Sequence, residues 1–343
     1  MTQPTAAMTN LCFVIHGVGL HYSTSTPLLV EPVLKLLGHF HDESGATPVP
    51  LHIQFEAVES REKIPVGIPP SARRLSTAEG SSLRDGARTK WGCVMVQDGP
   101  RLIADFYDDG LIVIDLAKHI AEGYLVRPQE SPVGTVEWYL HFALVELLKL
   151  RGLFTLHATA LEKNGYGVLI PGYSGRGKTT SFVALLRSGY RYLADDTPFL
   201  REDGRGVRIL SFPMKVDVTD STISFFPELR NAPRGVLRSG VHKKYFFVED
   251  VYPSGITDSC PPALILFPRV MDRPKSMLEP LPKSRAIEAM MPQALLVHDQ
   301  ELARQEFQVL SKLVQQADCY TLHFGHDVLE LPDLVTPLLE GRR

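Results

Sequence analysis

Cysteine is scarce and widely spaced in this chain of 343 residues. The four cysteines are Cys12, Cys93, Cys260 and Cys319, and no two of them form a C-x-x-C pair. Structural zinc sites draw on closely spaced cysteines, so this spacing argues against structural zinc. Reduced thiols in a cytoplasmic protein are the interpretation that we adopt.

An excess of positive charge and long apolar runs are also missing. The 36 lysines and arginines are outnumbered by 39 aspartates and glutamates, and the formal net charge of −3 argues against a general nucleic-acid or membrane-surface binder. Residues 1–10 contain no lysine or arginine, and the apolar run Leu11–Ile15 is too short for the core of a signal peptide. No stretch approaches the roughly 18 apolar residues of a membrane-spanning helix. We therefore expect no nucleic-acid partner and no membrane partner.

The overall composition is typical of a folded globular protein. Hydrophobic residues make up 44% of the sequence and charged residues 22%, which is ample for a sizeable core. At 343 residues, two domains are the natural expectation. We place the boundary at residue 130. The smaller mixed α/β module over 1–130 would recognise a substrate, and the larger domain covers 131–343.

The first 130 residues are predicted to form strands and a helix. Apolar spacing indicates a helix over Pro27–Leu37. The tract 59–90 is rich in proline and polar residues and is predicted to be a long loop. Alternating or apolar runs predict strands at 11–15, 49–58, 91–96, 101–107 and 111–116, of which the last three form a meander.

The clearest helix in the sequence covers Thr135–Arg151. Its apolar residues recur at intervals of three and four, while Glu137, His141 and Lys149 face the other way. Gly152 ends the helix. We expect this helix to cover the core of the second domain and to mark the domain junction.

A phosphate-binding loop is the most informative motif of the chain. Residues 172–179 read Gly-Tyr-Ser-Gly-Arg-Gly-Lys-Thr, which is a complete G-x-x-x-x-G-K-[ST] pattern. The apolar strand 167–170 precedes it and the helical run 180–187 follows it, as the motif requires. Glycines let the backbone curl so that successive N–H groups face a phosphate, and the helix N-terminus adds partial positive charge. The alternative, a chance glycine-rich turn, does not account for these flanks.

The motif assigns nucleotide binding to a continuous set of residues. Lys178 would reach the β- and γ-phosphates, and the Thr179 hydroxyl would hold Mg²⁺. The predicted nucleotide-binding residues are Gly172, Tyr173, Ser174, Gly175, Arg176, Gly177, Lys178, Thr179 and Thr180.

Two neighbouring carboxylates follow the loop. Asp195 and Asp196 end the strand 191–194, which would place them with the loop at the C-terminal edge of an α/β sheet, where ligands bind. One carboxylate there can hold the metal together with Thr179, and the other can accept a proton from an attacking hydroxyl. The alternative is an acidic strand end that faces solvent or caps a helix. The sequence does not decide which aspartate has which role.

A histidine and a basic tract are further candidates. His157 lies on the strand 154–162 and could orient the acidic pair or a phosphate, but a strand histidine can equally be a packed structural residue. Arg230, Arg234 and Arg238 are spaced to share a helix face, in a basic tract that ends at residue 244. If this tract is a flap that closes over the nucleotide, Lys244 or Arg238 could neutralise transition-state charge on the γ-phosphate. Lys215 is a further candidate for the same role. The alternatives are a solvated basic face and a surface for an acidic peptide.

These motifs together resemble those of HPr kinase/phosphorylase-like proteins. The likeness covers about residues 135–212, is looser over 213–339 and is not seen before 130. Within the family, the chain looks most like the divergent kinases of peptide-maturation systems, such as lasso-peptide kinases. The segments that share the family's order and spacing are His157–Ala160, the Asn164-Gly165 turn, Gly172–Thr179, Arg187–Arg191 and Leu193–Asp196.

The resemblance implies a phosphoenolpyruvate-carboxykinase-like P-loop domain of mixed α/β class, which phosphorylates a hydroxyl in a reaction that depends on ATP and Mg²⁺. The acceptor is usually a serine of a protein or peptide, and the resemblance also suggests a homo-oligomer. The strand histidine, loop lysine, metal-binding hydroxyl and two aspartates of the family map to His157, Lys178, Thr179, Asp195 and Asp196. The predicted catalytic residues are Asp195, Asp196, His157, Lys178 and Lys244, and the predicted metal ligands are Thr179, Asp195 and Asp196.

Two features depart from the family pattern. The loop carries Thr179 where the family has a serine, which is chemically equivalent. The short glycine-rich signature before the C-terminal helices of HPr kinase/phosphorylases is not found, which argues against HPr as the substrate and against the phosphorylase activity. Two alternatives remain: a kinase of a small hydroxylated metabolite, and a nucleotide-gated regulatory protein that transfers no phosphate. The presence of both aspartates with the loop lysine and threonine argues against the second.

Overall fold

The chain divides into two compact units, the first made of Met1–Arg151 with Val236–His242 and the second of Gly152–Gly235 with Lys243–Arg343. The boundary predicted at residue 130 lies before the helix Thr135–Lys149 (α2), whereas the boundary between the two compact units lies after this helix, at Arg151. The functional division at residue 130 stays a prediction. The computed structural model describes residues 7–44, 51–84, 87–131, 134–173, 175–236, 242–252, 255–294 and 299–340.

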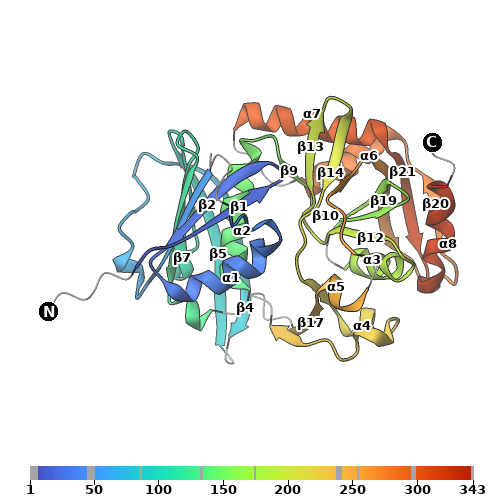
Figure 1. The fold of residues 1–343 in the computed structure, drawn as a ribbon, viewed down its shortest axis with the longest axis horizontal. Helices are drawn as coiled ribbons and strands as arrows, with labels where there is room; N and C mark the ends of the chain where they lie inside the picture. The colour runs from blue at the N-terminus through green and yellow to red at the C-terminus, as the bar shows by residue number, and fades with distance from the viewer. Residues whose placement is uncertain are drawn as a thin grey trace. The chain divides into compact units, whose positions relative to one another are not determined.

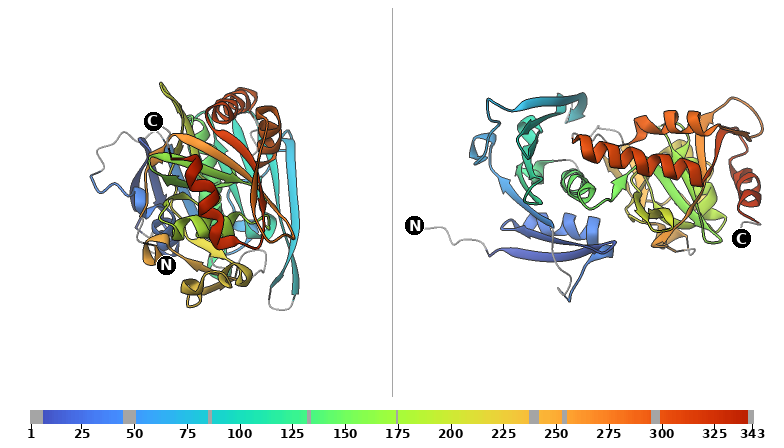
Figure 2. Two further views of the ribbon diagram at one scale, coloured as in Figure 1. Left: turned by 90° about the vertical axis from the view of Figure 1, so that its right-hand side faces the viewer. Right: turned by 90° about the horizontal axis from the view of Figure 1, so that it is seen from above.

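Within the described residues, the first unit is built on an eight-stranded sheet in the order β1-β2-β3-β8-β7-β6-β5-β4. The pairs β2/β3 and β3/β8 are parallel, and the other neighbours are antiparallel. The sheet curves around α1 (Val30–Leu37) and α2, which pack against each other (Figure 2). The strands are β1 (Thr9–Ile15), β2 (Val18–Thr24), β3 (Leu51–Val58), β4 (Arg73–Arg84), β5 (Ala87–Asp98), β6 (Arg101–Asp105), β7 (Gly110–Asp115) and β8 (Ile120–Val126).

The predicted strands and the predicted helix of this unit are confirmed, but the predicted loop over 59–90 is wrong in its second half. That half forms most of the hairpin of β4 and β5. Polar composition does not prevent strand pairing, because the ladder is made of backbone groups, and β4 is an edge strand, where polar residues are common. Composition alone therefore favoured a loop where a paired edge strand forms.

Helix α2 belongs to the sheet of the first unit. It packs on β3, β7 and β8, and the ring of its Tyr139 lies 4.5 Å from that of Phe106, which precedes β7. The expectation that this helix covers the core of the second domain is therefore wrong. Apolar periodicity indicates that a helix has a buried face, but it does not name the sheet that covers this face.

In the described part of the second unit, the strands form three sheets, in the orders β12-β10-β11-β19-β21-β20, β18-β14-β13-β9 and β15-β17-β16. The first of these sheets carries the phosphate loop, because the loop follows β11. The strands are β9 (Phe154–Thr155), β10 (Ala158–Lys163), β11 (Tyr166–Pro171), β12 (Arg191–Ala194), β13 (Phe199–Asp203), β14 (Gly206–Leu210), β15 (Val216–Val218), β16 (Arg234–Val236), β17 (His242–Phe246), β18 (Ser259–Cys260), β19 (Pro262–Val270), β20 (Met277–Pro280) and β21 (Asp318–Phe324).

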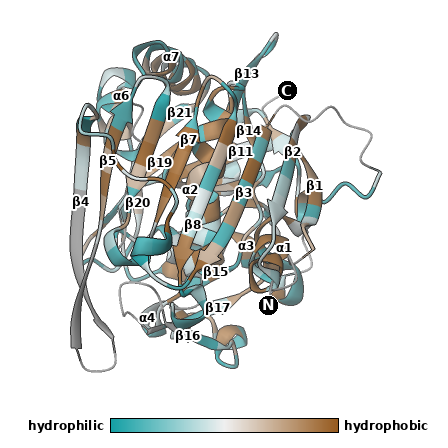
Figure 3. Cartoon of the chain, turned by 90° about the vertical axis from the view of Figure 1, so that its left-hand side faces the viewer, coloured by the Kyte–Doolittle hydropathy of each residue, from teal (hydrophilic) through white to brown (hydrophobic). Residues whose placement is uncertain are grey.

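Helices cover this central sheet from two sides (Figure 1). Residues of α3 and α8 belong to one buried hydrophobic cluster, and residues of α6 and α7 belong to another. Strand β11 divides its side chains between them, with Val168 and Ile170 in the first cluster and Leu169 in the second. Hydrophobic residues also run along β19 and β21 (Figure 3). This two-sided burial confirms the mixed α/β class.

The helices of the second unit are short apart from α7. They are α3 (Lys178–Arg187), α4 (Asp220–Ile223), α5 (Val248–Val251), α6 (Lys283–Met290), α7 (Gln300–Gln316) and α8 (Leu331–Val335). Every helix in the described part of the chain is too short or too polar to cross a bilayer.

Candidate active site

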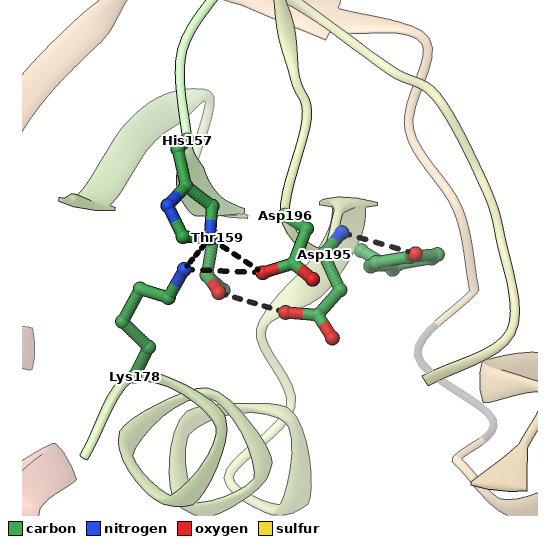
Figure 4. Close-up of polar contacts among 6 residues, drawn as sticks. His157, Thr159, Lys178, Asp195 and Asp196 are labelled. Carbon is green, nitrogen blue, oxygen red and sulfur yellow. Dashed lines mark hydrogen bonds and ion pairs between the residues drawn. The ribbon is translucent and has the colours of Figure 1, made fainter. Parts of the chain in front are cut away.

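The antiparallel register of three neighbouring strands brings the predicted site residues together. Strand β10 lies between β11 and β12, with Ala158 paired to Pro171 and Ala160 paired to Ala194. The start of β10 therefore lies beside the ends of both neighbours. Because the phosphate loop follows β11 and the aspartates follow β12, residues 157–159 lie between the loop helix and the acidic pair (Figure 4).

The phosphate loop has the backbone conformation that its motif requires. Gly172, Gly175 and Gly177 have φ values of 153°, 80° and 90°, which residues with a side chain rarely adopt. The helix follows without a break, since α3 begins at Lys178. Ser174, a member of the predicted nucleotide-binding set, lies outside the described residues.

The other predicted nucleotide-binding residues lie on the loop surface or in the first turn of α3. Tyr173 and Arg176 are exposed, and Thr179 is half-buried. The Thr180 hydroxyl is 3.0 Å from the hydroxyl of Thr222 in α4, and this contact ties the first turn of α3 to the segment after β15.

Lys178 is 5% exposed, and its ammonium group lies between His157 and Asp196 (Figure 4). Its Nζ is 2.7 Å from His157 Nε2 and 3.0 Å from Asp196 Oδ1. The same carboxylate oxygen is 3.3 Å from His157 Nε2. A buried ammonium group is costly unless it has charged or hydrogen-bonding partners, and these two side chains supply them. We call His157, Lys178 and Asp196 the Lys178 cluster.

The two aspartates lie in different environments although they are adjacent in sequence. Asp195 is 7% exposed, and its Oδ1 accepts a hydrogen bond of 2.9 Å from the Thr159 hydroxyl. The Asp196 side chain is 58% exposed. A left-handed backbone at Asp196, with φ of 73°, turns the chain between the two side chains. Its carbonyl accepts a hydrogen bond from the Ala158 N–H at 3.1 Å, which fixes this turn to β10.

Burial and neighbouring charges move the two pKa values apart. Burial, and after it the negative charge of Asp196, raises the pKa of Asp195 to about 7, although the hydrogen bond from Thr159 acts against this shift. Desolvation would also raise the pKa of Asp196. The contact with His157 Nε2 and the charge of Lys178 outweigh it and hold that pKa well below its usual range. Near neutral pH, the pair can therefore carry a proton on Asp195 and a negative charge on Asp196.

Replacing Asp195 by Asn is expected to stabilise the protein at pH 8 and to change its stability much less at pH 4. The pKa of Asp195 is raised by folding, so its ionisation costs the folded protein stability as pH rises from the unfolded value of about 3.9 toward the folded value. Asparagine removes this cost. We expect Asp195→Asn to increase the free energy of unfolding by about 3 kcal/mol more at pH 8 than at pH 4. Urea unfolding of both proteins at the two pH values measures this difference.

The matched control for this measurement is Asp333→Asn, which changes an exposed aspartate of the same unit. We expect its effect to be small at both pH values, because substitutions of exposed side chains usually change stability little. An Asp195→Asn effect that does not grow with pH would contradict the assignment of Asp195 as a buried carboxyl with a raised pKa.

The predicted basic flap is not the helix that the arginine spacing indicated. Arg234 begins strand β16, Lys244 lies in β17, and Arg230 lies in the turn before β16. Pro233 interrupts the tract and disfavours a helix there, so the prediction of a shared helix face is wrong for Arg230 and Arg234. Arg238 lies outside the described residues. The Lys244 ammonium donates a hydrogen bond to the Arg230 carbonyl, and its catalytic role stays a prediction.

Lys215, the other lysine candidate, lies in a segment that is bonded to the acidic pair. Its ammonium group is 2.7 Å from Asp217 Oδ1. The preceding residue, Met214, is hydrogen-bonded through its backbone N–H and C=O to the Tyr192 hydroxyl, at 3.2 Å and 3.1 Å. The same hydroxyl accepts a hydrogen bond from the Asp195 N–H at 3.1 Å. A buried tyrosine therefore joins the two segments.

Thr159 and Tyr192 contact Asp195 directly, and the sequence analysis assigned neither of them a role. Thr159 could have been found, because alternation along the predicted strand 154–162 places it on the same face as His157. The structure breaks that strand into β9 and β10, with a bend at His157 between them, so the prediction of one continuous strand is wrong. Tyr192 carries no such signal, since a tyrosine in a buried strand is an ordinary core residue.

The donor atoms of the site suit Mg²⁺. The carboxylates of Asp195 and Asp196 and the hydroxyl of Thr179 supply hard oxygen atoms. In the described ranges, no three His, Cys, Asp or Glu side chains converge on a metal position. Mg²⁺ that arrives with a nucleotide needs only one or two protein carboxylates, because phosphates and water complete its coordination. The residues present therefore fit the predicted cofactor.

Curated HPr kinase/phosphorylases match part of this chain. The chain is 35% identical over 69 residues to the HPr kinase/phosphorylase of a Geobacillus species, which is 20% of this chain and 22% of that protein. It is 33% identical over 92 residues to the HPr kinase/phosphorylase of Caldanaerobacter subterraneus, 27% of this chain and 29% of that protein. The chain thus spans less than a third of the length of these relatives.

Other comparisons add little to these matches. No family model matches the chain. The solved structure of the HPr(Ser) kinase/phosphatase from Coxiella burnetii aligns with 54% of this chain and 93% of its own, at 14% identity and a TM-score of 0.27, a likeness too low to carry an argument. The narrower resemblance to lasso-peptide kinases stays a prediction. Over the stretch that its relatives share, the chain is HPr kinase/phosphorylase-like, which confirms the resemblance that its motifs predicted.

Proposed function

We propose that this protein is a kinase that transfers the γ-phosphate of ATP to a hydroxyl, which we take to be a serine of a protein or peptide. The observation that carries the proposal is the Lys178 cluster, in which the phosphate-loop lysine contacts both His157, in the bend before β10, and Asp196. A general phosphate-loop motif accounts for the lysine but not for His157 or for the buried Asp195 beside it. The partial sequence similarity to HPr kinase/phosphorylases supports a protein substrate.

The loop and the start of α3 would bind the phosphates of the nucleotide. The backbone N–H groups of the loop and the N-terminus of α3 present partial positive charge, and Lys178 adds a full charge. Lys178 is now paired with Asp196, so phosphate binding would draw the ammonium group away and leave the Asp196 carboxylate available. Mg²⁺, held by the Thr179 hydroxyl and the aspartates, would supply further neutralisation of phosphate charge.

At the γ-phosphorus, the transfer forms one bond and breaks one. The acceptor oxygen bonds to the γ-phosphorus while the bond from phosphorus to the bridging oxygen breaks, and ADP leaves with that electron pair. The hydroxyl proton passes to a carboxylate of the aspartate pair. Lys178 stabilises charge on the transferred group, and His157 orients Asp196. Catalysis is then mostly alignment and electrostatics.

The proposal is tested by incubating the full chain with γ-labelled ATP, Mg²⁺ and serine-containing peptides encoded near its gene, with alanine-substituted peptides as controls. We expect label on the serine, located by mass spectrometry, and none on the alanine peptides. Label on a small hydroxylated metabolite would instead support the metabolite kinase. Nucleotide binding without transfer to any acceptor would support the regulatory protein and contradict the proposal. The cytoplasmic location and the homo-oligomer stay predictions.

Replacing Lys215 by Ala is expected to lower kcat by about 10²-fold, which is typical for the loss of one group that stabilises transition-state charge. Its segment is bonded to the Asp195 backbone through Met214 and Tyr192, and we expect its ammonium group to exchange Asp217 for the phosphates when a nucleotide binds. Steady-state kinetics of the variant measure the loss. Lys244→Ala is measured beside it, and a greater loss there would support the predicted catalytic role of Lys244 instead of a role for Lys215.

A further inference from the structure

The Tyr192 side chain connects three segments that surround the acidic pair. Its ring is fully buried and packs edge-on against Phe182 of α3, with 5.5 Å between ring centroids. Its hydroxyl accepts hydrogen bonds from the N–H groups of Asp195 at 3.1 Å and Met214 at 3.2 Å, and donates one to the Met214 carbonyl at 3.1 Å. A tyrosine hydroxyl has one proton to donate and accepts up to two bonds, so its capacity is fully used.

The local backbone explains why a side chain is needed at this position. Strand β12 ends at Ala194, where an isolated parallel bridge pairs Ala194 with Phe212, and the Phe212 N–H donates to the Leu193 carbonyl at 2.9 Å. The N–H groups of Asp195 and Met214, which would continue a regular parallel pairing, donate to the Tyr192 hydroxyl instead. The Tyr192 hydroxyl takes the place of the missing ladder and bonds the backbones on both sides of the gap.

We propose that Tyr192 is a positioning residue for phosphoryl transfer, whose hydroxyl holds the Asp195 backbone and the Met214–Asp217 segment in register beside the phosphate loop. This inference rests on the proposed function. Asp195 is held at its carboxylate by Thr159 and at its N–H by Tyr192, so both ends of the residue are fixed from neighbouring elements. The charge of Asp217 acts on Asp195, which agrees with the two segments lying close together.

Removing the hydroxyl leaves three backbone groups without their partner: the N–H of Asp195 and the N–H and C=O of Met214. Without the hydroxyl, the backbones of Asp195 and Met214 can shift relative to each other. A displacement of a catalytic group by about 1 Å can cost about 10²-fold in rate. We expect Tyr192→Phe to lower kcat by about 10- to 100-fold. The KM for ATP should stay nearly unchanged, because the loop and Lys178 are not altered.

Tyr190→Phe is the matched control. Tyr190 is also fully buried, and its hydroxyl is 3.0 Å from the Thr336 hydroxyl, away from the aspartates. Both variants remove one buried hydroxyl from a tyrosine in or beside β12, so a loss of stability alone should affect them alike. The split between kcat and KM, measured for both variants at matched folded fraction, separates positioning from stability.

A second readout does not need catalysis. Amide hydrogen exchange should be at least about tenfold faster at Asp195 in Tyr192→Phe, because the amide loses its acceptor, and unchanged there in Tyr190→Phe. Faster exchange together with lower kcat in Tyr192→Phe alone supports the inference. Unchanged kcat, or an equal loss of kcat in both variants, overturns it. If the wild-type chain transfers no phosphate, the proposed function fails, whereas faster exchange at Asp195 would still support the anchoring by Tyr192.

Discussion

Asp195→Asn and Asp196→Asn are each expected to lower phosphotransfer by about 10²- to 10⁴-fold while nucleotide binding stays largely intact. The proposed transfer needs a carboxylate to accept the proton of the acceptor hydroxyl and carboxylate oxygens to hold the metal, and asparagine supplies neither a base nor a negative charge. The nucleotide phosphates would be bound mainly by the loop amides and Lys178, which these substitutions do not remove. Single-turnover transfer measures the chemical step, and calorimetry with a non-hydrolysable ATP analogue measures binding.

The two substitutions should differ in their other effects. Asp196 is the carboxylate partner of the buried Lys178, so Asp196→Asn leaves that ammonium group with His157 and should lower stability. The loss is reduced because the Asp196 side chain is 58% exposed and screened by solvent. Asp195→Asn should stabilise the protein at pH 8, because it removes a buried carboxyl that ionises at that pH.

The control for both substitutions is Asp220→Asn, at a side chain that is 74% exposed. Phosphotransfer that survives in both Asp195→Asn and Asp196→Asn would contradict the proposed mechanism.

Lys178→Met is expected to lower phosphotransfer by about 10²- to 10³-fold and to weaken nucleotide binding as well. Methionine keeps an apolar stem of similar length in the buried site but cannot neutralise phosphate charge. The substitution also removes the cation that helps to hold the pKa of Asp196 low, so that pKa should rise toward its ordinary value. The measurements are kcat, the affinity for the ATP analogue and the shift in unfolding temperature that the analogue causes.

Lys163→Met is the matched control for the loop lysine. Lys163 ends β10, in the same sheet, and its ammonium group donates hydrogen bonds to the carbonyls of Ser188 and Gly189, beyond the C-terminus of α3. It lies at the opposite end of β10 from His157, so its removal should leave transfer and analogue binding nearly unchanged. An equal loss of activity in both variants would mean that Lys178 acts through general stability rather than at the phosphates.

The phosphate loop was predictable because its information is local. The motif of eight residues contains both the glycines for positions with positive φ and the lysine at which the helix begins. The structure has positive φ at Gly172, Gly175 and Gly177, as the motif predicts. His157 was not decided in the same way. Its two interpretations stayed open until the register of β10 between β11 and β12 put its Nε2 2.7 Å from the Lys178 ammonium group.

Helix α2 and the tract 59–90 show that local sequence patterns do not predict which distant segment an element packs against or pairs with. The periodicity of α2 predicted a helix with a buried face, but its contacts with β3, β7 and β8 assign that face to the first unit. The polar tract predicted a loop, yet most of its second half pairs with a neighbouring strand. In both cases the deciding partner is a segment elsewhere in the chain, and composition or periodicity within one segment does not name that partner.

By itself, the sequence determined the phosphate loop, the acidic pair at a strand end, the strand histidine as a candidate and the mixed α/β class, because each depends on residues that are close together along the chain. Only the tertiary structure decided that Asp195 is buried while Asp196 is exposed, that Lys178 rests between His157 and Asp196, and that Tyr192 anchors the Asp195 backbone to Met214. These relations arise from strand order, register and a left-handed turn, which bring distant residues to within hydrogen-bonding distance and set how much water reaches each charge.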